Sequence, residues 1–215
     1  MNQKAFFISS AIVLIIATSV SIGFGQIING DINGDKKIDL KEAIYALQVT
    51  AGLKPATSFA LQSNAFADGE AIPKKYACDG ENKSPALSWT DAPAGTKSFV
   101  LIVDDPDAIS VAGIIWDHWI VYDIPSSISF LAENAGATGG ANLPSGAKHG
   151  KNSYARLCYD GPCPPSGTHH YYFKLYALDV ETINPLNTKK EGIDAAMRGH
   201  VLGETVLMGT YVILP

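Results

Sequence analysis

Residues 159–178 constrain the fold of this chain more than any other part of its sequence. The first half of the stretch combines three prolines with two glycines, which indicates a rigid loop with exposed backbone amides rather than a helix or a regular β-ladder. The second half, residues 171–178, is rich in the aromatic and branched residues that suit a largely buried strand. His169, His170 and Tyr171 lie at the junction, where donors are held in place before a ligand arrives. The stretch therefore predicts an anion pocket.

Other segments have the pattern of a β-rich domain, with Asp-Gly turns between short apolar runs. Apolar runs predict strands at residues 98–103 and 116–124, and a closing strand at 201–214. The loose composition of residues 136–150 predicts a long loop that borders the site, and residues 192–197 carry a helical pattern. These elements predict a mainly antiparallel β domain with one or two short helices.

Composition and charge limit the class of function. With 215 residues, of which 47% are hydrophobic, the chain can bury one substantial core and a small accessory module. Its formal net charge of -5 argues against general nucleic-acid binding, which requires a basic face. Any anion site must therefore be local.

The first 25 residues have the features of a signal peptide. Lys4 gives a positive start, residues 5–20 are apolar, and Gly23-Phe24-Gly25 forms a small-x-small cleavage site. We expect an exported protein, periplasmic or extracellular. The alternative is an uncleaved anchor, although the continuous apolar core is shorter than a membrane span usually needs.

An oxygen-rich loop follows and predicts a calcium site. In a twelve-residue calcium loop, side-chain oxygens occupy positions one, three, five, nine and twelve, and a backbone carbonyl occupies position seven. The residues at these positions, which we expect to bind a structural calcium ion, are Asp31, Asn33, Asp35, Lys37 (carbonyl), Asp39 and Glu42. The alternative is an acidic, solvated turn.

Residues 26–54 as a whole resemble one repeat of a dockerin, the calcium-binding module of secreted bacterial proteins. An amphipathic pattern over residues 40–52 supplies the helix after the loop. The sequence departs from the dockerin pattern at Lys36, which replaces the usual glycine at position six, and only one repeat is present. We therefore do not expect binding to a cohesin.

Residues 55–63 are interpreted as a linker and residues 64–215 as the main domain. Three cysteines, Cys78, Cys158 and Cys163, allow one disulfide in an oxidising compartment and leave one thiol. The sequence does not choose the pair.

Three motifs in the main domain carry a resemblance to a known family. They are Asp105-Pro106-Asp107-Ala108, Trp116-Asp117-His118-Trp119, and the Gly-Pro-Cys-Pro-Pro-Ser-Gly-Thr-His-His-Tyr run from Gly161 to Tyr171. Together they resemble the phosphatidylethanolamine-binding protein family, and most closely its bacterial Raf-kinase-inhibitor-like branch of the YbhB/YbcL type. The likeness extends over nearly all of the main domain.

The resemblance implies an antiparallel β-sandwich, here with one or two short helices and a small N-terminal calcium-loop and helix module. It also implies a non-enzymatic protein with a small pocket for phosphate-like anions or phospholipid headgroups. The residues that the resemblance assigns to this pocket are Asp105, Asp107, His118, Gly161, Cys163, Pro164, His169 and Tyr171. At His170 the family usually has arginine, so a permanent cation is replaced by a group that is neutral or charged depending on pH.

The residues alone leave other interpretations open. His118 and His169 are also consistent with core histidines whose hydrogen bonds are satisfied, and the aspartates with turn caps. One alternative is a protein-interaction module that binds a protein partner and inhibits a protease or kinase. The other is a hydrolase that uses His118 or His169 as base, although no serine or cysteine lies in a nucleophile-elbow pattern.

Overall fold

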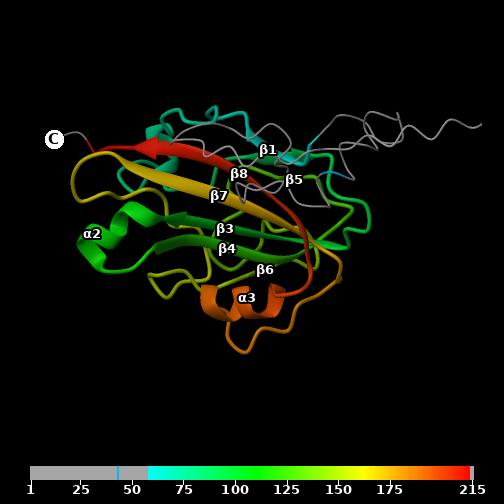
Figure 1. Ribbon diagram of the computed structural model, residues 1–215. Coiled ribbons are helices and arrows are strands. Elements are labelled where there is room, and N and C mark those ends of the chain that lie inside the picture. The colour runs from blue at the N-terminus through cyan, green and yellow to red at the C-terminus, as the bar shows by residue number, and fades with distance from the viewer. Residues whose placement is uncertain (1–42, 44–57, 214–215) are drawn as a thin grey trace, which may run out of the picture.

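The computed structural model describes residues 58–213, together with residue 43, and forms two antiparallel sheets (Figure 1). The smaller sheet has the strand order β1-β2-β5, with bounds Ala60–Ser63, Leu87–Thr90 and Phe130–Leu131. The larger sheet has the order β6-β4-β3-β7-β8, with bounds Lys148–His149, Trp116–Pro125, Ser98–Asp105, His169–Leu178 and Val201–Tyr211. Every neighbouring pair of strands in both sheets is antiparallel.

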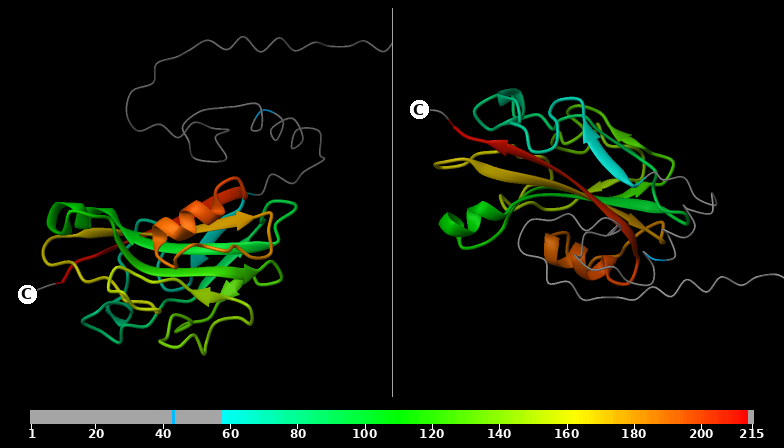
Figure 2. Two further views of the ribbon diagram at one scale, coloured as in Figure 1. Left: turned by 90° about the horizontal axis from the view of Figure 1, so that it is seen from below. Right: turned by 45° about the horizontal axis from the view of Figure 1, so that its top comes forward.

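The helices are short and lie outside the sheets. They are the α-helices α2 (Ile109–Ala112) and α3 (Lys190–Met197) and the 3₁₀ turns η1 (Lys74–Tyr76) and η2 (Pro106–Ala108). Figure 2 shows α3 on one side of the five-stranded sheet and the three-stranded sheet on the other. Within the described part of the chain, no helix is both long and apolar enough to cross a membrane.

Strand β3 explains how one sheet supports two cores. All eight of its residues are buried. Phe99, Leu101 and Val103 face the core between the two sheets, while Val100 and Ile102 face a second core against α3. A strand buried on both faces needs a continuous apolar run, which is the pattern in the sequence. Each large apolar side chain buried in this way stabilises the fold by about 1.5–3 kcal/mol.

The structure confirms a mainly antiparallel β fold with short helices, and it extends most of the predicted elements. The strand predicted at 98–103 continues to Asp105, and the helix predicted at 192–197 begins at Lys190. The closing strand, predicted at 201–214, is shorter than expected and ends at Tyr211. The predicted loop at 136–150 contains β6, which pairs with β4 through His149 and Val121.

The predicted linker at 55–63 is wrong at its C-terminal end. Residues 60–63 form β1, which pairs with β2 along its whole length. Leu61 is buried in the core between the sheets, and its backbone N–H donates to Thr205 Oγ1 at 3.1 Å. The domain therefore begins before residue 64. The sequence did not reveal β1 because the strand is short and Leu61 is its one large apolar residue.

The signal segment and the calcium loop from Asp31 to Glu42 lie outside the described residues, so export and calcium binding stay predictions. The cysteine pairing that the sequence left open is Cys78–Cys163. Cys158 is a buried free thiol in the described part of the chain.

Candidate functional site

The antiparallel order of the large sheet brings three distant segments to one end. Strand β3 ends where β4 and β7 begin, so Asp105 pairs with Trp116 and Asp104 pairs with Tyr172. The predicted site residues of the Asp-Pro-Asp turn, the Trp-x-His strand and the His-His-Tyr strand therefore meet at this end. Side-chain contacts join Asp105 to His169 and His118 to Tyr171.

A β-bulge in β4 directs His118 into the interior. Val103 pairs with Trp119, but the next residue, Asp104, pairs with Asp117, so His118 is an extra residue without a partner on β3. A bulge of this kind re-aims a side chain that strict alternation would place on the opposite face. His118 is 3% exposed, and its ring lies 5.2 Å from that of Tyr171, centroid to centroid.

The hydrogen bond of His118 determines its tautomer. Its Nδ1 lies 2.7 Å from the backbone oxygen of Asp160, and a carbonyl oxygen only accepts, so Nδ1 carries the proton. Burial lowers the pKa of His118, against the opposing effects of the Asp160 backbone oxygen and of nearby carboxylates. The ring is therefore neutral at pH 7, and its Nε2 offers a lone pair rather than a proton.

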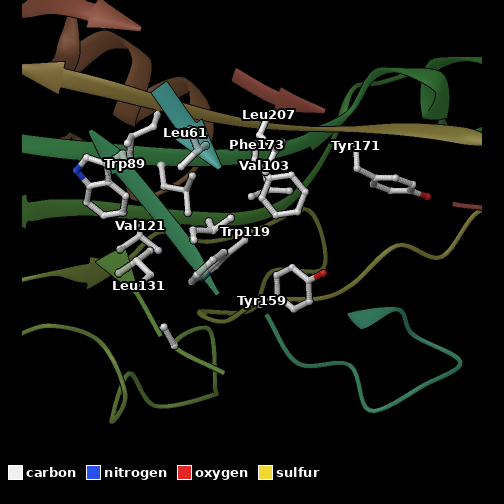
Figure 3. Close-up of a cluster of buried hydrophobic side chains, with 14 of the residues drawn as sticks. Leu61, Trp89, Val103, Trp119, Val121, Leu131, Tyr159, Tyr171, Phe173 and Leu207 are labelled. Atoms are coloured by element: carbon white, nitrogen blue, oxygen red, sulfur yellow. The ribbon is translucent and has the colours of Figure 1, made fainter. Parts of the chain in front are cut away.

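Tyr171 supplies a complementary donor. Its side chain is 1% exposed, and its hydroxyl has no hydrogen-bond partner among the described residues. Figure 3 shows Tyr171 at the edge of the buried cluster, with its hydroxyl pointing away from the aliphatic residues. Burial raises the pKa of Tyr171, and the negative charge of Asp105 raises it further, so the phenol keeps its proton. A buried hydroxyl without a partner costs free energy unless a ligand or water supplies one.

Asp105 holds both its own turn and a histidine. One carboxylate oxygen accepts from the backbone N–H of Ala108 at 3.2 Å and caps η2, and the other lies 2.7 Å from His169 Nδ1. Both side chains are almost fully buried, 4% exposed for Asp105 and 8% for His169. The carboxylate thus orients the imidazole at the first residue of β7.

Asp107 and His170 form a second pair at the surface. Asp107 Oδ2 accepts from the backbone N–H of His170 at 2.8 Å and lies 2.7 Å from its Nδ1. The side-chain hydrogen bond from His170 is the main cause of the lowered pKa of Asp107. Both side chains are about half exposed, so this pair lies at the rim of the site.

The proline-rich loop packs beside these residues in a fixed position. A side chain at Gly161 would collide with the backbone oxygen of Tyr76, and the Gly161 N–H donates to Asn82 Oδ1 at 2.7 Å. The Cys78–Cys163 disulfide ties the loop to the segment after η1, and Pro164 is buried. The backbone of Cys163 is close enough to Tyr171 to lower its pKa slightly against the larger effect of burial.

Two open depressions lie at this end of the molecule. One is lined by Pro106, Asp107, Ile109, Ser110, Ser166, Thr168 and His169, and the other by Ala71, Ile72, Thr168, Thr210, Tyr211 and Val212. His118 and Tyr171 line neither of the two and lie deeper in the interior. The predicted residues thus converge in two layers rather than around one small pocket: Asp107 and the buried His169 border the first depression, and His118 and Tyr171 lie beneath.

Sequence reasoning missed the residues that support the site. Asp160 accepts from His118, and its side chain accepts from Asn152 Nδ2 at 2.8 Å and from Arg156 Nη1 at 2.8 Å. The position of Asp160, directly before the proline-rich loop, is the one signal in the sequence that points to it. Nothing in the sequence pattern distinguishes Asn152. It is buried, and its side-chain oxygen accepts from the backbone N–H groups of the turn that follows it.

The arrangement offers one acceptor, His118 Nε2, and one donor, the Tyr171 hydroxyl, beside a buried carboxylate. Across the described residues, no group of three or more His, Cys, Asp or Glu side chains could hold a metal ion. The site therefore suits a small polar group that donates one hydrogen bond and accepts another.

Comparisons with known proteins identify the family to which the chain belongs. The chain is 48% identical to a UPF0098 protein of Methanothermobacter thermautotrophicus over 151 residues, which cover 70% of this chain and 97% of that protein. The crystal structure of Escherichia coli YbcL, described as a member of the mammalian PEBP family, matches with a TM-score of 0.68 and 34% identity and covers 74% of this chain and all of that one.

A putative phosphatidylethanolamine-binding protein homologue from Chlamydia trachomatis matches with a TM-score of 0.64 and 42% identity, over 73% of this chain and 98% of that one. Residues 62–212 match the family described as Phosphatidylethanolamine-binding protein, and this range contains both sheets except for the first two residues of β1. By this match and by the identity of its relatives, the chain belongs to the phosphatidylethanolamine-binding protein family.

Proposed function

We propose that this chain is an exported, non-enzymatic binding protein whose site around His118 and Tyr171 accepts a phosphate-like anion or a phospholipid headgroup. The observation that carries the proposal is the buried Tyr171 hydroxyl, which has no hydrogen-bond partner in the described part of the chain. Its family membership supports a binding role.

The tautomer of His118 limits which chemical groups can bind beside it. Because Nε2 accepts, the ligand must donate a proton to it while accepting one from Tyr171. A singly protonated phosphate group has both an O–H and acceptor oxygens. Phosphoethanolamine adds an ammonium group, which can pair with a carboxylate such as Asp105 or Asp107. A fully deprotonated anion has no hydrogen to donate and would bind more weakly.

Isothermal titration of the purified protein with phosphoethanolamine and with inorganic phosphate tests the proposal. We expect heat from the wild type and none from His118→Ala. A matched control is His200→Ala, because His200 pairs with Asp179 at 2.8 Å at the surface and touches no residue of the site. Absence of heat from the wild type with every phosphate and headgroup tried contradicts the proposed function.

A hydrolase is the second candidate, favoured by the Asp105–His169 pair. The carboxylate orients a histidine that borders a depression lined also by Ser110 and Ser166, which is the order of groups found in nucleophilic catalysis. Hydrolysis of ester or phosphodiester substrates by the wild type, abolished in His169→Ala and retained in His200→Ala, would replace the binding proposal with this one.

A further inference from the structure

The charges buried around the site do not by themselves favour an anion. Asp105 and Asp160 are buried, and Asp107 adds a third carboxylate at the rim. His118 is neutral at pH 7 because burial lowers its pKa. Like charges in a poorly solvated site repel strongly, so an anionic ligand needs a permanent cation nearby.

One salt bridge among residues 58–213 joins a permanent cation to a carboxylate of the site. Arg156 Nη1 lies 2.8 Å from Asp160 Oδ1. The lysines in the same set of salt bridges pair with other acidic residues: Lys74 with Asp79, Lys75 with Glu133, Lys83 with Glu81, Lys148 with Asp123, Lys174 with Asp104, and Lys190 with Asp194.

A tight turn fixes the position of Arg156. The Asn152 side-chain oxygen accepts from the backbone N–H groups of Tyr154 and Arg156, both at 3.0 Å, and Ala155 between them has a φ of 61°. An alanine in the left-handed region persists only where the surrounding bonds hold it. The backbone that carries Arg156 is therefore pre-organised.

The guanidinium group itself is held at two points and is otherwise open. Its Cζ lies 5.4 Å from the centroid of the Tyr154 ring, which packs edge-on against Trp116 at 5.1 Å. Trp116 precedes His118 by two residues on β4, and Asp160 accepts both from Arg156 and, through its backbone oxygen, from His118 Nδ1, so these contacts connect the cation to the site. One of its five N–H donors binds Asp160, and the side chain is 61% exposed, which leaves donors facing solvent.

His170 does not fill this role. Asp107 accepts from both the backbone N–H and Nδ1 of His170, which leaves the ring one further nitrogen rather than several free donors. An arginine with free donors keeps its charge at every physiological pH and binds phosphate oxygens in pairs.

We propose that Arg156 forms the charged subsite of the anion site and selects phosphomonoesters by contacting their outer oxygens. The inner oxygens then face Tyr171 and His118. This inference rests on the proposed binding function and adds the residue that determines charge selectivity.

Titration calorimetry with phosphoethanolamine and inorganic phosphate, at low and at high salt, tests the inference. Arg156→Gln is expected to weaken binding about tenfold or more and to reduce the dependence of affinity on salt, because one charge-assisted contact is lost. Arg156→Lys should retain part of the affinity and the salt dependence. Lys148→Gln is the control, since Lys148 pairs with Asp123 away from the site and its loss should change neither value.

The outcomes separate this inference from the proposed function. If the wild type binds neither compound, the function fails. If the wild type binds and Arg156→Gln binds equally well, Arg156 is not the charged subsite. Weaker binding by Arg156→Gln with an unchanged salt dependence also overturns the inference, because it indicates a structural role. If Arg156→Gln does not fold, Arg156→Lys decides: affinity and salt dependence near the wild-type values support the subsite, and loss of both overturns it.

Discussion

Two buried tyrosines in neighbouring regions differ in one respect. The Tyr159 hydroxyl donates to the backbone oxygen of Tyr76 at 2.8 Å, and the adjacent residues Asn152 and Asp160 are bonded on every side. The Tyr171 hydroxyl, equally buried, has no such partner in the described residues. A buried tyrosine hydroxyl is therefore hydrogen-bonded in one region of the interior and without a partner in the other. The satisfied region stabilises the loop, and the unsatisfied region keeps a hydrogen bond available for a ligand.

Reduction of the disulfide should give the largest effect, because the disulfide fixes the proline-rich loop that lies between the two regions. Cys78 and Cys163 are 85 residues apart, so their bond removes the entropy of closing a long loop from the unfolded chain. We expect dithiothreitol to lower the free energy of unfolding by about 2–5 kcal/mol, as measured by urea denaturation. Cys158→Ala, which leaves the disulfide intact, should show the same sensitivity to reductant. An unchanged midpoint after confirmed reduction would contradict this prediction.

Loss of Asn152 should come next. Its side chain bonds Asp160 Oδ2, the Cys158 carbonyl and the backbone N–H groups of Tyr154 and Arg156, and all of these would lose a partner. We expect Asn152→Ala to destabilise the protein by about 2–4 kcal/mol in thermal and urea unfolding.

Asn142→Ala is the matched control for that variant. Asn142 is exposed and donates once, to the Asn134 carbonyl at 3.0 Å. Its loss should change stability by less than about 0.5 kcal/mol. Equal losses in the two variants would show that the network around Asn152 has no special role.

Tyrosine-to-phenylalanine variants test the comparison directly. Tyr159→Phe leaves the Tyr76 carbonyl without its donor, so we expect about 1–3 kcal/mol of lost stability and unchanged anion binding. Tyr171→Phe removes a hydroxyl without a partner, so stability should stay within about 0.5 kcal/mol while binding is lost. Unfolding curves and calorimetry on the same samples measure both. Lost binding in Tyr159→Phe together with lost stability in Tyr171→Phe would refute the distinction between the two regions.

The smallest effect concerns pH. The pKa of His118 is lowered in the folded state below its ordinary value of 6.5, so the uncharged ring favours folding. This contribution is fully present above about pH 6.5 and is lost as pH falls through the folded pKa. His118→Asn should therefore flatten the decline of stability between neutral and acidic pH. His149, whose pKa burial also lowers, accounts for part of the remaining slope.

His200→Asn is the control for the pH profile. His200 is half exposed and pairs with Asp179 at the surface, away from both buried histidines. In His200→Asn, stability should decline between neutral and acidic pH more steeply than it does in His118→Asn. A slope unaffected by the loss of His118 would show that its protonation is not linked to unfolding.

The sequence predicted those features that depend on local pattern. The apolar run of β3 and the aromatic run of β7 predicted both strands, and the three motifs predicted which side chains meet. The bulge at His118 escaped prediction because it depends on the register between two strands, which alternation within one strand does not reveal. The roles of Asn152 and Asp160 were missed for a similar reason, since their partners come from the folded loop. The disulfide partner of Cys163 also required the fold.

The extra residue in β4 has a consequence for how this chain can change. Residues on either side of His118 follow two alternations that are offset by one position, so deleting a single residue there would merge them into one regular ladder. Such a deletion would improve strand pairing and remove the imidazole from the interior at the same time. The position of the imidazole therefore depends on the length of β4, and we expect relatives without a histidine in the interior at this point to have a β4 that is shorter by one residue.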